Sequence, residues 1–154
     1  MNKKHTPQDM NQEQIKNILK FIDATQSENI KKIIFNQLGR ECFHCRNLDK
    51  WVEQFKTDVQ TFLDRVNVHH QSTYWESLIF SKDKRTLILT GRKVEGCACP
   101  FADCNQPPIS LCYHCCKSFQ QEFFKTLFGK EVEVKITESY LLGNEHCSTT
   151  IHFI

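Results

Sequence analysis

Apolar residues change their spacing once along this chain, from a helical to a strand-like pattern. In residues 7–23 they recur every three or four positions, and Ser27 begins a second such stretch with Gly39 as its predicted stop. Residues 47–66 carry the strongest apolar stripe at helical spacing, which predicts a third and central helix. The first part of the chain is therefore expected to be helical.

Shorter apolar runs, rich in β-branched and aromatic residues, follow. Two pairs of such runs predict two β-hairpins, one from 74–80 with 86–94 and one from 131–142 with 147–154. Between the hairpins, residues 109–128 return to helical spacing until Gly129. The order ααα-ββ-α-ββ predicts an α+β fold, in which helices pack on one face of a four-stranded antiparallel sheet.

One domain is expected to span residues 1–154, with a helical part at 1–66 and the sheet with a cysteine-rich helix at 74–154. The sequence has no apolar run long enough to cross a bilayer and no secretory signal, which predicts a cytoplasmic protein. Twenty basic and eighteen acidic residues give a formal charge of +2 without a basic stripe. This charge pattern argues against nucleic acid as a partner and leaves a homodimer open.

Cysteines give the strongest chemical signal in the sequence. The nine cysteines are Cys42 and Cys45, Cys97 and Cys99 with Cys104, Cys112 with Cys115 and Cys116, and Cys147. Their odd number and the missing export signal argue against a disulfide framework, so the thiols are expected to be reduced. Two thiolates at such close spacing can bind one tetrahedral metal ion. The pairs therefore predict a thiolate-rich site.

We expect one zinc ion to be bound by Cys42, Cys45, Cys99 and Cys115. It would tie together the turn between the second and third helices, the first hairpin and the fourth helix. For each pair the alternative is two small buried side chains, because free cysteine is among the most buried residue types. The cysteines at the start of the fourth helix also meet the positive end of its dipole, which favours the thiolate. Iron–sulfur or haem binding stays open, since spacing alone does not separate zinc from iron.

Residues near the cysteines are interpreted by the face they share. Cys112 and Cys116 lie on one stripe with Phe119 and Phe123 and are expected in the core, whereas Cys115 lies about 100° off that stripe. Cys115 is therefore the better candidate ligand and Cys116 the better core residue.

Other candidates are weaker. Cys147 is expected in the core of the last strand, and His44 and His114 are interpreted as non-ligands although each lies inside a cysteine pair. Trp51 and Trp75 are candidate walls of an apolar cavity, with ordinary core packing as the alternative.

The second half of the chain carries the motifs of a known group of domains. It combines a Cys-x-Cys after a strand, a cysteine-rich helix start, the segment Phe128-Gly-Lys-Glu-Val-Glu-Val134 and the closing Gly143-Asn144-x-x-Cys147 before alternating residues. In these motifs, over about residues 74–154, the chain resembles the small-molecule-binding domain shared by 4-vinyl-reductase-like proteins and TRAPP-type trafficking subunits. It is also similar to the related bacterial aminothiazoline-carboxylate hydrolases. Relatives usually have Asp after the glycine and an aromatic residue two positions past the cysteine, where this chain has Asn144 and Thr149. The resemblance implies binding of a small, often apolar molecule or a metal.

Two classes of function stay open. In the first, a domain without catalysis binds zinc and binds or senses a small apolar molecule, in a cavity between the sheet and the Phe119 and Phe123 face of the fourth helix. In the second, a thiolate near Cys115 attacks a small thiazoline or amide substrate, with His114 or another histidine as base. The sequence shows no complete set of nucleophile, base and orienting acid, so no catalytic residue is assigned and the binding function is favoured.

Overall fold

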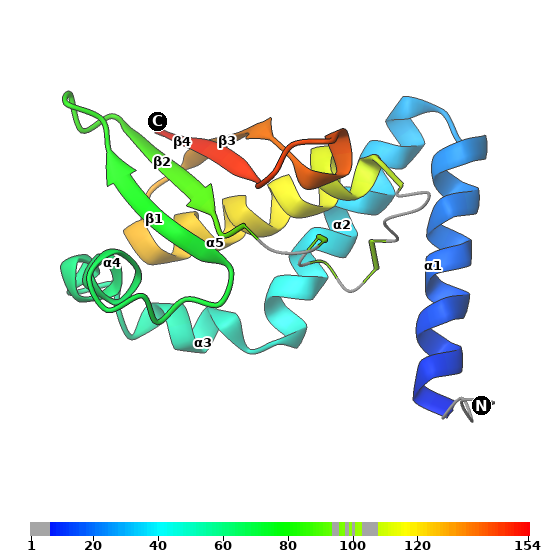
Figure 1. The fold of residues 1–154 in the computed structure, drawn as a ribbon, viewed down its shortest axis with the longest axis horizontal. Coiled ribbons are helices and arrows are strands. Elements are labelled where there is room, and N and C mark those ends of the chain that lie inside the picture. The colour runs from blue at the N-terminus through cyan, green and yellow to red at the C-terminus, as the bar shows by residue number, and fades with distance from the viewer. Residues whose placement is uncertain (1–6, 94–95, 98, 100, 103–107) are drawn as a thin grey trace.

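The computed structural model describes residues 7–93, 96–97, 99, 101–102 and 108–154. Its elements are the helices α1 (Pro7–Thr25), α2 (Glu28–Cys45), α3 (Leu48–Glu53), α4 (Val59–Asn67) and α5 (Lys117–Phe128), the strands β1 (Trp75–Phe80), β2 (Thr86–Gly91), β3 (Val132–Glu138) and β4 (Ser148–Phe153), a π-helix η1 (Leu111–Cys116) and a 3-10 helix η2 (Tyr140–Leu142). Figure 1 shows the sheet above α2 and α5, with α3 and α4 at one end and α1 at the other.

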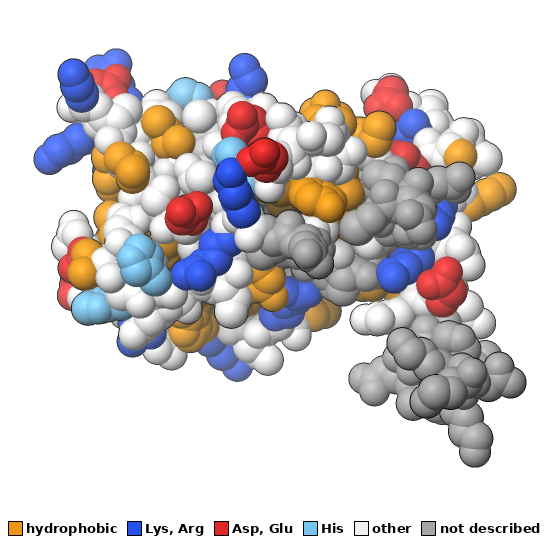
Figure 2. All heavy atoms as spheres, viewed as in Figure 1, with side chains coloured by type: hydrophobic (Ala, Val, Ile, Leu, Met, Phe, Trp, Pro, Cys, Tyr) orange, Lys and Arg blue, Asp and Glu red, His pale blue; other side chains and the backbone are white. Residues whose placement is uncertain are grey.

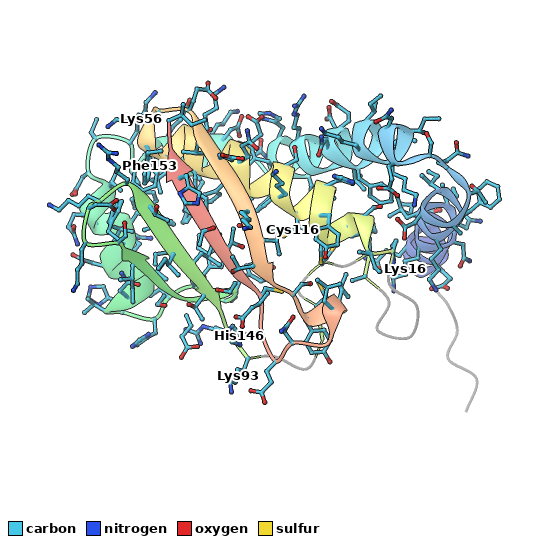
Figure 3. All side chains as sticks on the ribbon, turned by 90° about the horizontal axis from the view of Figure 1, so that it is seen from above. Lys16, Lys56, Lys93, Cys116, His146 and Phe153 are labelled. Atoms are coloured by element: carbon cyan, nitrogen blue, oxygen red, sulfur yellow. The ribbon has the colours of Figure 1, made fainter. Side chains whose placement is uncertain are left out.

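The four strands form one antiparallel sheet in the order β1-β2-β4-β3, which Figure 3 shows from above. Leu87 of β2 and Val134 of β3 both pair with Ile151 of β4, and all three side chains are fully buried. Along β2 the exposed Ile88 separates the buried Leu87 and Leu89, so one face of the strand points to the core. The predicted α+β class and the four-stranded antiparallel sheet are confirmed.

Helices pack on this sheet and share its core. α5 packs along β3, α4 packs against β1, and α2 lies against both α5 and η1. Buried side chains from α2 to α5 and from all four strands form one apolar cluster, in which Phe43, Phe62 and Phe124 are almost fully buried. Burying one such side chain stabilises the fold by about 1.5–3 kcal/mol. The phenylalanines are therefore a main source of stability.

Gly39 lies inside α2, whereas the sequence predicted that it ends the helix. α2 continues to Cys45, so the first cysteine pair belongs to its last turns and not to a following loop. Gly39 is buried, and a β-carbon there would overlap the carbonyl oxygen of Cys115 and lie 3.0 Å from the backbone nitrogen of Phe119. A glycine is needed because the backbones of α2 and the cysteine-rich helix touch at this point.

The single helix predicted at residues 47–66 is also wrong. Two helices, α3 and α4, occupy this stretch, and Asp58 caps the second by accepting a hydrogen bond from the Thr61 backbone N–H at 3.2 Å. Both helices carry part of the same apolar stripe, and the break between them still leaves Phe55 only 7 % exposed. Periodicity could not reveal a break that keeps the stripe intact.

The helix predicted at residues 109–128 begins with a π-helical turn. η1 precedes α5, which ends as predicted at Gly129, whose φ is +63°. The wider π turn shifts the residues around the axis relative to an α-helix, so Cys115 is buried at 7 % exposure and Cys116 only partly buried. The sequence analysis had expected Cys116 in the core and Cys115 off the core stripe.

No helix in the described part of the chain is long and apolar enough to cross a membrane. On the face drawn in Figure 2, Lys and Arg side chains are spread over separate parts of the surface.

Candidate ligand pocket and thiol cluster

A thiol cluster lies where α2, η1, the segment after β2 and the residue before β4 meet. We use this name for Cys42, Cys97, Cys99, Cys112, Cys115, Cys116 and Cys147, because the charge on each of these thiolates would act on at least one other member. Cys99 and Cys115 also pack in one small apolar cluster with Leu19 and Phe35. Cysteines from four separate segments thus converge in space.

Burial dominates the chemistry of these thiols. It raises the pKa of Cys97 to about 12 and that of Cys112 to about 11, from an ordinary value of 9.0. The pKa values of Cys99 and Cys115 are raised for the same reason. The Ser139 hydroxyl oxygen lies 2.9 Å from the Cys112 sulfur and lowers its pKa, but by less than burial raises it. The expected gain of thiolate from the helix dipole is therefore outweighed, and Cys97, Cys99, Cys112 and Cys115 are protonated at neutral pH.

The four predicted zinc ligands do not form one preformed site. Cys42, Cys99 and Cys115 are neighbours in the thiol cluster, whereas Cys45 is exposed at the last residue of α2. Among the residues that the structure describes, no group of three or more His, Cys, Asp or Glu side chains is arranged to hold a metal ion. Cys104 lies outside the described residues.

Zinc binding by the four cysteines stays a prediction, as do the iron–sulfur and haem alternatives. Elemental analysis of the purified protein, with its absorption spectrum, tests all three, and we expect about one zinc ion per chain. Metal at background level, with all nine thiols freely titratable in the native protein, would exclude a bound metal.

An aromatic pocket lies between α5, the α3 and α4 pair, and the segment before β1. It is half open, has a volume of about 550 Å³, and is lined by Arg46, Leu48, Trp51, Phe62, Arg65, Val66, residues 71–75, Phe119 and Phe123. The Phe123 ring centroid lies 4.9 Å from that of Trp75, 5.7 Å from that of Phe62 and 6.4 Å from that of Trp51. Phe119 and Phe123, the two predicted pocket residues, both line this pocket.

The pocket opens in a different direction from the one predicted. The space between α5 and the sheet is filled, because Phe124 and Leu127 are fully buried there in the same core as Val134 and Ile151. The open side lies instead toward α3 and α4. On this side α5 contacts α3, and β1 contacts α4.

Two arginines give the pocket a polar side that the sequence analysis missed. The Arg65 guanidinium lies 5.0 Å from the centroid of the Phe55 ring, which is a favourable cation–π distance. Arg46 is the residue after α2. Burial raises the pKa of Cys99, and the positive charge of Arg46 lies near enough to lower that pKa in part. A guanidinium group binds carboxylates well. Neither position gave a sequence signal, because isolated arginines are usually solvated.

The similarity of the chain to known proteins lies in its structure. No protein-family model and no curated protein matches it. Among solved structures, it is similar to a trafficking protein particle complex subunit 3 from Naegleria fowleri, a crystal structure in which that protein is covalently bound to palmitic acid. The TM-score is 0.53 and the identity 10 %, over 94 % of this chain and 96 % of the other. This chain has a TRAPP-type fold.

The similarity includes the N-terminal helices, for which the sequence motifs gave only the order of elements. At 10 % identity it shows the fold alone. It supports the TRAPP-type part of the sequence resemblance and gives no support to the 4-vinyl-reductase or aminothiazoline-hydrolase parts.

Proposed function

We propose that this chain is a binding domain, without catalysis, for a small and largely apolar molecule held in the aromatic pocket. The observation that carries the proposal is the convergence of six aromatic rings on one half-open pocket of about 550 Å³. These rings come from α3, α4, β1 with the residue before it, and α5, and they are Trp51, Phe62, Tyr74, Trp75, Phe119 and Phe123. Binding sites for small molecules commonly have volumes of about 300–1,000 Å³ and mostly apolar linings.

An acyl chain with a free carboxylate is the ligand class that we favour. Its hydrocarbon part would contact the aromatic rings, and its carboxylate would pair with Arg46 or Arg65 at the polar side of the pocket. The structurally similar trafficking subunit is covalently bound to palmitic acid, and we extend acyl-chain binding to this chain as part of the proposal.

A thiol hydrolase is less favoured for a chemical reason. The attacking species in such enzymes is a thiolate, and burial raises the pKa of Cys115 well above neutral pH. His114, the candidate base, lines a different pocket.

The binding proposal can be tested with a fluorescent fatty acid such as cis-parinaric acid, titrated into the purified protein beside its methyl ester. We expect saturable binding that Thr73→Trp weakens by about tenfold or more, because the new ring would occupy space in the pocket. Thr57→Trp, which also changes an exposed threonine but lies outside the pocket, is the matched control. Arg46→Gln should weaken binding of the acid more than binding of the ester.

The intact mass of the purified protein shows whether a chain is attached covalently. Absence of saturable binding, or equal affinity in Thr73→Trp and Thr57→Trp, would contradict the proposal. Hydrolysis of a thiazoline or amide substrate that is abolished by Cys115→Ala but retained in a folded Cys104→Ala control would establish the enzyme alternative instead.

A further inference from the structure

A second pocket lies where the turn between α1 and α2 meets the start of η1 and the strand β3. We call it the basic pocket. Its volume is about 720 Å³, and it shares no lining residue with the aromatic pocket. In Figure 1 the turn between α1 and α2 lies at the opposite end of the molecule from α4. Its lysines come from α2 (Lys31 and Lys32), α5 (Lys117) and β3 (Lys135).

The lining of this pocket has a surplus of positive charge. Four lysines face two carboxylates, Asp23 and Glu28, which leaves a formal charge of +2 at neutral pH. The whole chain also has a formal charge of +2, so the remaining residues balance each other. A surplus of positive charge therefore lies on the lining of this pocket.

Both carboxylates are already engaged. Glu28 forms a salt bridge of 2.9 Å with Lys31. Asp23 accepts a hydrogen bond from the Ile109 backbone N–H at 3.1 Å and another from the Ser110 hydroxyl, so it holds the chain just before η1. Both carboxylates keep their negative charge and act on the neighbouring His114, so they offset two of the four lysine charges.

Three cations remain for a ligand. In the described part of the chain, no carboxylate forms a salt bridge with Lys32, Lys117 or Lys135. Lys32 and Lys117 line the same pocket as His114. Burial lowers the pKa of that histidine, and the charges of Lys32 and Lys117 lower it further, whereas Glu28 and Asp23 raise it. Cations from different elements that lie this close repel one another, and a bound anion would relieve that repulsion.

The pocket also has apolar sides. Ile109 is 43 % exposed and Tyr113 46 % exposed, and Ile136 completes this part of the lining. The volume is larger than one phosphate group requires, so an organic group attached to the anion would contact these side chains.

We propose that the basic pocket binds a phosphate group carried by an organic molecule, with Lys32, Lys117 and Lys135 contacting the phosphate and Tyr113 and Ile109 contacting the organic part. Lysine ammonium groups bind phosphate as point charges, and several of them from separate elements create a local anion site. The phosphate can belong to a free phosphorylated metabolite or to a phospholipid headgroup, since the chemistry that recognises it is the same. The proposal is independent of the aromatic pocket.

Isothermal titration calorimetry with inorganic pyrophosphate, at constant ionic strength, tests the site in the full chain. We expect saturable binding that the double variant Lys32→Gln/Lys117→Gln weakens by about tenfold or more. The double variant Lys50→Gln/Lys82→Gln removes the same charge from exposed positions outside the pocket and should change the affinity less than about twofold. Thermal unfolding of each variant verifies that it is folded, and Lys117→Arg, which keeps the charge, should retain binding.

Sedimentation with vesicles of phosphatidylcholine, with and without phosphatidic acid, distinguishes the two sources. Binding to pyrophosphate alone supports a free phosphorylated ligand, and additional binding to phosphatidic acid vesicles that depends on Lys32 and Lys117 supports a lipid headgroup. If neither pyrophosphate nor the phosphatidic acid vesicles bind saturably, the proposal is overturned. An equal loss of affinity in the two double variants would also overturn it, because net charge and not the pocket would then account for binding.

Discussion

Gly39 determines how closely α2 approaches the cysteine-rich helix. Helix propensity alone predicts that Gly39→Ala stabilises the protein by about 1 kcal/mol. The overlap of the new β-carbon with the Cys115 carbonyl oxygen predicts an overpacking cost of about 1–3 kcal/mol or more. A backbone group cannot rotate away as a side chain does, so we expect the steric effect to exceed the propensity effect and the free energy of unfolding to fall.

Urea denaturation measures this difference, with Gln37→Ala on the exposed face of the same helix as control. The control should change stability by less than about 0.5 kcal/mol. A Gly39→Ala variant as stable as the wild type would show that the two helices separate at little cost.

The buried thiols predict a loss of stability at high pH. Burial raises the pKa of Cys97 to about 12 and of Cys112 to about 11 in the folded protein, against an ordinary 9.0, so the unfolded chain ionises first. Their contribution is fully present below the unfolded value and is lost as the pH rises through the folded values. Thermal unfolding followed from neutral pH into this alkaline range should therefore show a falling melting temperature.

Other groups also titrate in alkali, so the comparison between variants isolates the thiols. Between neutral and alkaline pH, the melting temperature of the Cys97→Ala/Cys112→Ala variant should fall by less than that of the wild type. Cys45→Ala, which changes an exposed cysteine, should follow the wild type. If the melting temperature falls equally with pH in all three proteins, these two thiols do not determine the pH dependence of stability.

At the scale of elements, Asp58 decides where α4 begins. Its carboxylate accepts hydrogen bonds from the Thr61 hydroxyl and then the Thr61 backbone N–H, which lower the pKa of Asp58 below its ordinary 3.8. The stabilisation is present above the ordinary pKa and is lost as the pH falls through the lowered one. Asp58→Ala should lower the melting temperature at neutral pH, whereas Asp58→Asn, also a good cap, should keep most of it. If Asp58→Ala and the wild type have the same melting temperature, the cap does not stabilise the helix.

Several elements were predictable because their signals are local. The two hairpins follow from alternating residues, and the end of α5 follows from Gly129, which needs no distant partner. The role of Gly39 was not predictable, since it depends on the close contact of α2 with a segment about 75 residues away in sequence. The π turn of η1 was not predicted either, because apolar spacing does not separate it from an α-helical turn. Asp58 did carry a capping signal, but the continuous apolar stripe concealed it.

The candidate site divides in the same way. Phe119 and Phe123 were predicted as pocket residues because aromatic side chains at helical spacing are visible in the sequence. Which side of α5 stays open depends on how α3 and α4 pack, and periodicity does not report that. The cysteine pairs were visible for the same local reason, whereas the approach of Cys97, Cys112 and Cys147 depends on tertiary structure.

At the scale of the whole molecule, the helices and the sheet share one apolar core, and a pair of tryptophans can report on both parts. Trp51 lies in α3 and Trp75 in β1, and each ring contacts Phe62 and Phe123. Unfolding of either part would expose rings that the other part covers, so we expect one cooperative transition. Trp51→Phe and Trp75→Phe each leave one fluorescent reporter, and in each variant the urea midpoint from fluorescence should coincide with the midpoint from far-UV circular dichroism. Separate midpoints would mean that residues 1–66 and 74–154 unfold as independent units in spite of their common core.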